Sequence, residues 1–235
     1  MAWVEHTYAD TAALARAVAG HLHDACVAGL ALHGTARLAL AGGKTPFPIY
    51  RALAEARHDW AGVLALPGDD RCVPHTHAAS NVAALRDAFA NAHGLEVAAL
   101  TAPDGDPDAS LAHARALLSP FHAAPLDAVV LGMGEDAHTA SLFPGAAALP
   151  AAMDPGTDED AFLLVPDPLP PEAPFPRITL GLARLLRAGS LHLVVTGARK
   201  REVLHGAQQV HDPLHAPISA LLHAPSATVH IHWSP

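Results

Sequence analysis

The chain has 235 residues, of which 51% are hydrophobic, and it carries a formal net charge of −9. This length and composition suit one large α/β domain, and we expect residues 1–235 to form a single domain. The acidic balance argues against a nucleic-acid partner, so an anionic substrate requires local positive charge.

The cysteines and the N-terminal sequence predict a cytoplasmic protein. Cys26 and Cys72 are the only two cysteines, and their wide separation indicates free thiols in a reducing compartment. The sequence MAWVEHTYAD has neither the basic region nor the apolar region of a signal peptide. Residues 11–32 are apolar but contain Arg16 and Asp24, so we do not expect this segment to cross a membrane. The sequence leaves the oligomeric state open.

Hydrophobic patterns predict helices and strands that alternate along the chain. From the N-terminus we expect a helix over residues 11–32, a strand over 37–41, a helix over 46–57, a strand over 62–66 and a helix over 81–89. There follow a helix over 110–118, strands over 126–131 and 162–165, a helix over 179–186, a strand over 191–196, a helix over 198–205 and a strand over 227–232. This alternation favours a doubly wound, mostly parallel sheet with helices on both faces, a Rossmann-like α/β fold.

The run GMGEDAHTASLFPG, residues 132–145, follows the buried strand expected over residues 126–131. Its glycine-rich turn presents Glu135, Asp136 and His138 in quick succession. Open α/β folds bind ligands at the carboxyl ends of their strands. The run therefore predicts titratable groups at a ligand-binding edge of the sheet.

The run AGGKTP, residues 41–46, joins the strand expected over residues 37–41 to the helix expected over residues 46–57. Gly42 and Gly43 permit close approach of a ligand, and Thr45 suits the N-cap of a helix whose free N–H groups attract phosphate. The nucleotide-binding P-loop is excluded because Leu38 occupies a position where that motif needs glycine. An ordinary strand-to-helix turn remains the alternative for this run.

The segment at residues 68–74 and the two lysines of the chain supply charged side chains. In GDDRCVP, residues 68–74, Asp69 could orient a histidine or contact sugar hydroxyls, and Arg71 could bind a phosphate or an oxyanion. A solvated turn is the alternative for this segment.

The chain has only two lysines, Lys44 and Lys200, and both open helices after glycine-bearing turns. Cations in a first helical turn oppose the helix dipole, and a bound anion explains their presence there.

In this order, AGGKTP, DDRCVP with the following SN, LGMGEDAHTASLFPG, RITL and the Gly-x-x-Lys of residues 197–200 resemble the 6-phosphogluconolactonase family. This family belongs to the glucosamine-6-phosphate isomerase/deaminase superfamily, and the resemblance runs from about Leu38 to Leu204. It implies hydrolysis of 6-phospho-D-glucono-1,5-lactone to 6-phospho-D-gluconate in the pentose phosphate pathway, without a metal or an organic cofactor. It also implies a catalytic group of His138, Asp69 and Arg71, and substrate or phosphate contacts from Gly42, Gly43, Lys44, Thr45, Arg177 and Lys200.

Three positions depart from the family pattern. Lys44 stands where the family often has serine, Asp70 replaces the usual glutamate, and Ala137 replaces the usual glycine before the histidine. If that glycine serves a positive φ, alanine strains the turn by roughly 1–2 kcal/mol. If it serves only close packing, the methyl group fits.

The mechanism that we expect is direct attack of water on the lactone carbonyl. A neutral imidazole has an ordinary pKa near 6.5 and can take the proton of water at physiological pH, which is the role expected of His138. We expect a nearby carboxylate to fix its tautomer and prefer Asp69, with Asp136 and Glu135 left open. Arg71 or a loop N–H faces the oxyanion, while Arg177 and Lys200 bind the phosphate.

Two other functions are weighed against this one. The deaminases of the superfamily carry a glutamate five residues after the histidine, and Phe143 occupies that place. An apolar ring cannot transfer protons, so lactone hydrolysis is favoured. The other alternative is a sugar-phosphate-binding regulator without chemistry, against which the intact set of Asp69, Arg71 and His138 argues.

Eighteen histidines are a high count and raise the question of a metal. Three His-x-His pairs occur, at residues 21/23, 75/77 and 230/232. Such pairs diverge on a helix and converge on a strand, but no cysteine or carboxylate completes a site. We therefore expect no metal, solvent-facing histidines, and a packed, unreactive Cys72.

Overall fold

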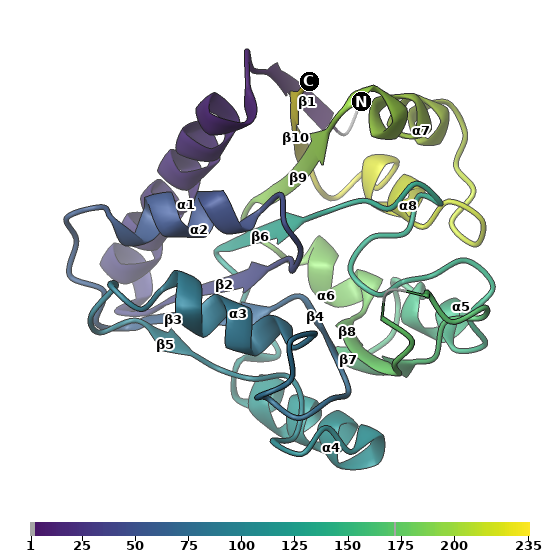
Figure 1. Cartoon of the computed structure of the whole chain (residues 1–235), viewed down its shortest axis with the longest axis horizontal. Coiled ribbons are helices and arrows are strands. Elements are labelled where there is room, and N and C mark those ends of the chain that lie inside the picture. Colours follow the sequence, from purple (N-terminus) through teal and green to yellow (C-terminus); the bar gives the residue numbers. More distant parts are fainter. Residues whose placement is uncertain (1–2, 172) are drawn as a thin grey trace.

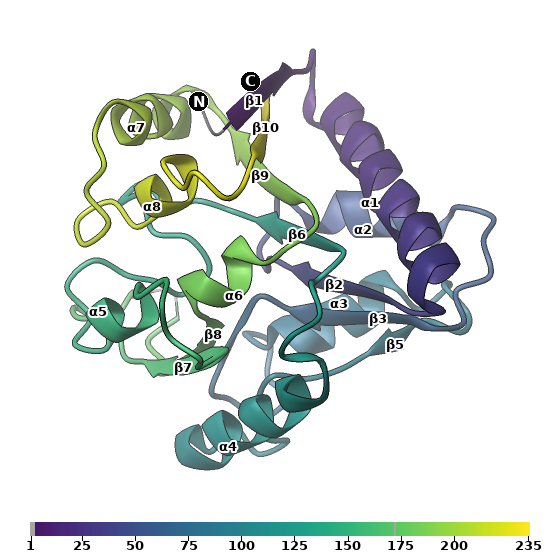
Figure 2. The same ribbon diagram turned by 180° about the vertical axis from the view of Figure 1, so that it is seen from behind.

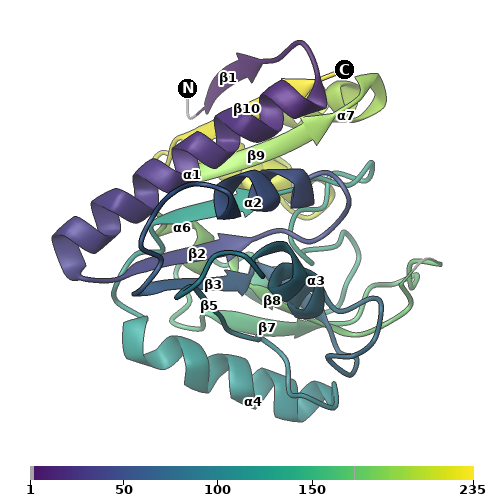
Figure 3. The same cartoon turned by 60° about the vertical axis from the view of Figure 1, so that its left-hand side comes forward.

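The computed structural model describes residues 3–171 and 173–235, and its main sheet has seven parallel strands. Their order across the sheet is β1-β10-β9-β6-β2-β3-β5, and Figure 3 shows them stacked in this sequence. The strands are β1 (Trp3–Thr7), β2 (Ala36–Leu40), β3 (Val63–Pro67), β5 (Glu96–Val97), β6 (Ala128–Leu131), β9 (Leu191–Thr196) and β10 (Val229–Ser234). The predicted doubly wound, mostly parallel sheet is confirmed.

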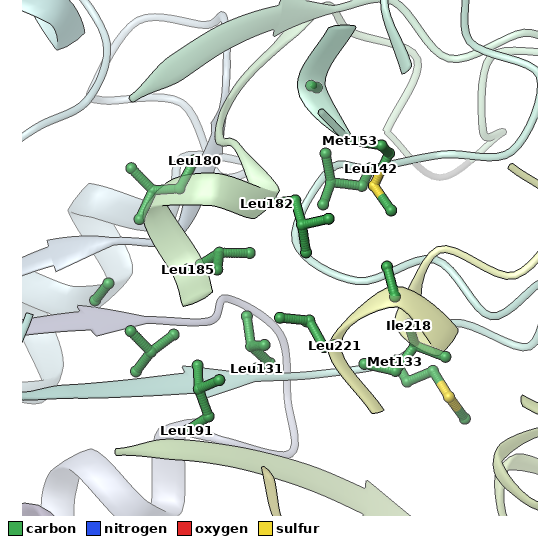
Figure 4. Close-up of a cluster of buried hydrophobic side chains, with 14 of the residues drawn as sticks. Leu131, Met133, Leu142, Met153, Leu180, Leu182, Leu185, Leu191, Ile218 and Leu221 are labelled. Carbon is green, nitrogen blue, oxygen red and sulfur yellow. The ribbon is translucent and has the colours of Figure 1, made fainter. Parts of the chain in front are cut away.

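Helices cover both faces of this sheet (Figures 1 and 2). One face packs against α1 (Thr11–His33), α2 (Phe47–Ala54) and α3 (Asn81–Ala88). The other layer contains α4 (Pro107–Leu118), the short 3-10 helix Ser119–Phe121, α5 (Leu149–Ala152), α6 (Leu182–Leu186), α7 (Ala198–Gln209) and α8 (Ile218–Leu222). Alternate side chains of each strand enter opposite layers, so Leu38 packs with α1–α3 and Ala39 with the other group. Figure 4 shows leucines of β6, β9, α6 and α8 in this second layer.

A second, antiparallel sheet of three strands was not predicted. It has the order β4-β8-β7, formed by Asp69–Arg71, Arg177–Leu180 and Ala161–Leu164. The helix expected over residues 179–186 is wrong in its first part, because Arg177–Leu180 is a fully buried strand and α6 begins only at Leu182. β-Branched Ile178 and Thr179 suit this buried strand. Its register places Arg71 opposite Arg177.

Strands β1 and β5 and helix α8 were also not predicted. Each is short, at two to five residues, and lacks the periodicity that identifies the longer elements. None of the helices described combines the length and the hydropathy needed to cross a membrane.

The chain reverses its direction of winding between β2 and β6, which are neighbours in the sheet. From β2 the chain continues outward to β3 and β5, and from β6 it continues the opposite way to β9 and β10. The connections that leave β2 and β6 therefore diverge, which opens a crevice at the carboxyl ends of these strands. The runs at residues 41–46 and 132–145 are these two connections.

Five histidine side chains lie together between the β1-β10-β9 edge of the sheet and α1, and we call them the histidine cluster. His6 and His232 are register partners in β1 and β10, with ring centroids 4.8 Å apart. His192 of β9 lies 5.3 Å from His232, and His21 of α1 lies 5.4 Å from His192. His230 stacks on His192 at 5.4 Å.

The expectation that the His-x-His pairs face solvent is wrong for His232, which is fully buried. Residues 230 and 232 point to the same side of β10, and α1 packs on that side. Within residues 3–171 and 173–235, no three His, Cys, Asp or Glu side chains are grouped so that they could hold a metal ion.

Candidate active site

A polar cleft of about 210 Å³ lies at the carboxyl edge of the sheet, where β2 and β6 diverge. Four cations and one carboxylate among the predicted residues border it, so the cleft is locally positive although the whole chain is acidic. All nine predicted site residues line this cleft: Gly42, Gly43, Lys44, Thr45, Asp69, Arg71, His138, Arg177 and Lys200.

The β2–α2 connection and the start of α7 form one side of the cleft. The Thr45 hydroxyl lies 3.5 Å from the Thr196 hydroxyl, and Lys200 borders the same space. Thr45 does not cap α2, contrary to expectation, because Pro46 is the N-cap residue and the helix begins at Phe47. Thr45 instead lines the cleft together with Thr196.

Asn81 also lines the cleft and organises its wall, although it is not among the predicted site residues. Its carboxamide nitrogen donates to the Asp69 carbonyl at 2.7 Å, and its carboxamide oxygen accepts from the Arg71 guanidinium at 3.0 Å. A Cβ at position 42 would lie 2.1 Å from that oxygen, so only glycine leaves room for Asn81. The available signal is the SN pair, which is one of the motifs that carry the family resemblance.

The contacts of Asp70 show what the carboxylate does at the position where the family usually has glutamate. Asp70 is a fully buried residue of β4 that contacts the first residues of α3. Its two oxygens accept from the backbone N–H groups of Asn81 at 2.6 Å and Val82 at 2.9 Å. Burial raises the pKa of Asp70 to about 6, although three backbone N–H groups oppose this shift. Asp70 thus holds Asn81 in place and takes no direct position in the cleft.

His138 is paired with Asp136, and the preference for Asp69 as its partner is wrong. The Asp136 carboxylate lies 2.5 Å from His138 Nδ1, whereas the buried Asp69 carboxylate accepts from the Ser141 hydroxyl at 2.5 Å. Burial alone would raise the pKa of Asp136, but its hydrogen bonds to His138 and the charge of that residue lower it. An ionised Asp136 accepts from Nδ1–H, which leaves the lone pair of Nε2 free.

Gly134 makes this pair possible. A Cβ at position 134 would lie 2.2 Å from His138 Nδ1 and 2.3 Å from an Asp136 carboxylate oxygen. The turn is closed by the Gly134 N–H, which donates to the His138 carbonyl at 2.9 Å. The sequence indicated a glycine-rich turn here, but only the three-dimensional course of the turn shows which acid reaches the imidazole.

For the lactone hydrolysis that the sequence resemblance implies, we expect Asp136→Asn to lower kcat by about 10–100-fold. This is less than the roughly 10⁴-fold loss typical of a buried triad carboxylate, because Asp136 is half-exposed and water compensates in part. Steady-state kinetics measure the effect, with Glu135→Gln as the matched control on the adjacent exposed carboxylate. A loss smaller than twofold, or an equal loss in the control, contradicts the assignment of Asp136.

Ala137 adopts the positive φ that the family glycine suggested, at +61°, and its methyl group is also buried. Conversion to glycine relieves roughly 1–2 kcal/mol of strain. It also loses a buried methyl group, about 0.8 kcal/mol, and adds about 0.4–1 kcal/mol of chain entropy to the unfolded state. We therefore expect Ala137→Gly to change the free energy of unfolding by less than about 1 kcal/mol, measured by urea denaturation. A larger change in either direction contradicts this balance.

Cys72, which follows Arg71 in the sequence, is buried. Burial raises its pKa to about 11, and nearby Asp70 contributes in the same direction. Burial likewise raises the pKa of Cys26 to about 12. Both thiols are free, as the sequence predicted.

A doubly wound sheet with a cation-lined cleft at its point of reversal, and a histidine–carboxylate pair inside it, defines an α/β protein equipped to bind a small anion and transfer a proton beside it. The sequence profile described as glucosamine-6-phosphate isomerases/6-phosphogluconolactonase matches residues 9–233. The chain belongs to this family.

Individual relatives cover nearly the whole chain. The 6-phosphogluconolactonase of Rhizobium meliloti (strain 1021) is 37% identical over 98% of both chains. That of Pseudomonas aeruginosa is 37% identical over 94% of this chain and 89% of the relative. The crystal structure of a 6-phosphogluconolactonase from Shewanella baltica OS155 superimposes with a TM-score of 0.91 at 29% identity, covering 99% of this chain and 97% of that one.

Proposed function

We propose that this protein hydrolyses 6-phospho-D-glucono-1,5-lactone to 6-phospho-D-gluconate. Full-length relatives at 37% identity are 6-phosphogluconolactonases, and the chain matches a family profile that includes this activity. The observation that carries the proposal is the convergence of the nine predicted residues on one positively charged cleft that contains His138. The chemistry needs acid–base and electrostatic groups only.

In the proposed mechanism, His138 Nε2 takes a proton from water while the water oxygen forms a bond to C1 of the lactone. The tetrahedral oxyanion then collapses, the bond between C1 and the ring oxygen breaks, and the ring oxygen takes the proton from the imidazolium. Asp136 stabilises that imidazolium through Nδ1, where it lies 2.5 Å away. Water is consumed, and the products are a carboxylate, a hydroxyl group and one released proton.

The cations of the cleft fall into two groups, and we assign a different part of the substrate to each. Arg71, His138 and Arg177 also border a second compartment, whereas Lys200 and the 42–45 loop border the first cleft alone. We assign the phosphate to Lys200, Thr45 and the glycines of that loop. We assign the oxygens at C1, where negative charge develops, to Arg71 and Arg177. Arg177 thereby differs from the phosphate contact that the sequence analysis expects of it, because it borders the second compartment and Lys200 does not.

The state of the two arginines supports this assignment. Arg177 is 5% exposed, and the Nε atoms of both Arg71 and Arg177 lack a hydrogen-bond partner among the described residues. Buried guanidinium N–H groups are costly when unpaired, and an oxyanion or a carboxylate would satisfy them.

The two alternative functions, a deaminase and a non-catalytic sugar-phosphate-binding regulator, can be tested with the same purified protein. Freshly generated lactone is expected to decay well above its spontaneous rate, while glucosamine 6-phosphate is expected to release no ammonia, because Phe143 stands where deaminases have glutamate. Ammonia release without lactone hydrolysis would establish the deaminase. Binding of 6-phosphogluconate without either turnover would establish a non-catalytic regulator.

A further inference from the structure

The ring of Phe143 packs against two of the functional side chains of the cleft. Its centroid lies 4.1 Å from that of His138, with the planes 29° apart. The Cζ atom of Arg177 lies 4.8 Å from the same centroid. Phe143 is 7% exposed and follows the turn closed by the Thr139–Leu142 bridge, so its ring is held by the surrounding fold.

The His138 imidazole needs a second contact to stay aligned. The hydrogen bond from Nδ1 to Asp136 fixes one edge of the ring but leaves the ring free to rock about that bond. Stacking on a flat aromatic surface removes this freedom and keeps Nε2 directed to one place. Because proton transfer requires close alignment, loss of the stacking surface reduces the reactive fraction of conformations.

Arg177 depends on the same ring. Its Nη2 donates to the Ala173 carbonyl at 3.1 Å, which fixes only one end of the guanidinium. The π face of Phe143 attracts the planar cation and sets the orientation of its remaining N–H groups. One side chain thus determines the geometry of both the base and a cation beside it.

The ring also distinguishes the charged from the neutral imidazole. The face of an aromatic ring carries partial negative charge, so it attracts an imidazolium more strongly than an imidazole. In the proposed mechanism, His138 is converted to an imidazolium as water attacks. An interaction that is stronger in the transition state than in the bound substrate raises kcat and leaves KM nearly unchanged.

We propose that Phe143 is a positioning residue whose ring aligns His138 and Arg177 for attack on the lactone. This inference rests on the proposed function, in which His138 is the base. At this position the family's deaminases carry a proton-transferring acid, and here the aromatic ring supplies orientation in its place.

The test compares Phe143→Leu with Phe143→Tyr. Leucine preserves an apolar side chain but lacks the π face, and it is expected to lower kcat about tenfold or more while KM stays within threefold. Tyrosine retains the face, and position 143 borders the second compartment, so kcat is expected to stay within threefold of the original. Phe175→Leu is the matched control, because Phe175 borders the same compartment but packs on His77.

Thermal unfolding and titration with 6-phosphogluconate accompany the kinetics, and unchanged product affinity shows that the cleft is intact. Phe143→Met replaces the leucine variant if that variant does not fold. The inference is overturned if the leucine variant keeps kcat within twofold, if tyrosine loses as much as leucine, or if Phe175→Leu loses as much as Phe143→Leu. Absence of lactone hydrolysis by the unsubstituted protein overturns the proposed function, and this inference with it.

Discussion

Substitution of His138 by alanine is expected to lower kcat for lactone hydrolysis by about 10²–10⁴-fold, the range that a positioned general base contributes. The residual rate comes from the cations that remain in the cleft, which still bind the substrate and stabilise the oxyanion. KM is expected to change little, because the proposed phosphate contacts of Lys200 and Thr45 are untouched.

The measurement is a continuous assay on freshly generated lactone, with the spontaneous rate subtracted. His77→Ala serves as the control, because His77 borders the second compartment that adjoins the cleft. This control is expected to retain its activity. Turnover of His138→Ala near the original rate, with 6-phosphogluconate still bound, contradicts the assignment of the base.

Mild acid is expected to destabilise the protein sharply, because His192 and His232 of the histidine cluster are buried in their neutral form. A chain of hydrogen bonds runs from the Tyr8 hydroxyl to His232 Nδ1 at 2.9 Å, and His232 Nε2 meets His192 Nδ1 at 3.0 Å. It continues from His192 Nε2 to the Ser190 hydroxyl, which donates to the Asp127 carbonyl. Since Ser190 donates onward, each imidazole accepts at Nδ1 and donates at Nε2, and this satisfies both in their neutral form.

The sign of the pH dependence follows from the direction of the pKa shifts. Burial, followed by the charge of neighbouring histidines, lowers the pKa of His192 to about 3 and that of His232 to about 2. Burial also lowers the pKa of His6 and of His230. In the unfolded chain these groups take up protons below about pH 6.5. Stability is therefore complete above that pH and is lost as the pH falls toward the folded values.

His192 and His232 alone are expected to remove about 4 kcal/mol between pH 7 and pH 5, which is a large part of a typical stability of about 5–15 kcal/mol. Urea denaturation at a series of pH values measures this slope. The double variant His192→Leu/His232→Leu is expected to flatten it, and exposed His93→Ala is the control that leaves it unchanged. Equal slopes in the original and double-variant proteins contradict the expectation.

The sequence predicted where the site lies, because its motifs follow strands and parallel strands end at a common edge. It could not predict which carboxylate meets His138, since Asp69 and Asp136 are separated by a turn whose course depends on Gly134 and a positive φ at Ala137. Arg71 and Arg177 became neighbours through a second sheet between segments about one hundred residues apart, and no local pattern encodes that register.

The contacts of Phe143 and the burial of the histidine cluster could also not be predicted from the sequence. Phe143 was interpreted through what it lacks, an acid, whereas its contacts with His138 and Arg177 depend on how the loop folds back. His232 looked like a surface residue because histidine is mostly polar in its preferences. Its burial depends on the pairing of β1 with β10 and on the packing of α1 against β10, and β1 has no recognisable sequence pattern of its own.

The placement of β10 between β1 and β9 has a consequence for how the protein is made. Translation produces β1 first, yet the strand to which it hydrogen-bonds, residues 229–234, leaves the ribosome more than two hundred residues later. During synthesis the sheet can grow outward from β2 and β6, but β1 cannot pair until β10 has been made. Pairing of β1 with β10 is therefore expected to be a late step of folding, because it joins two strands that are more than two hundred residues apart in the sequence.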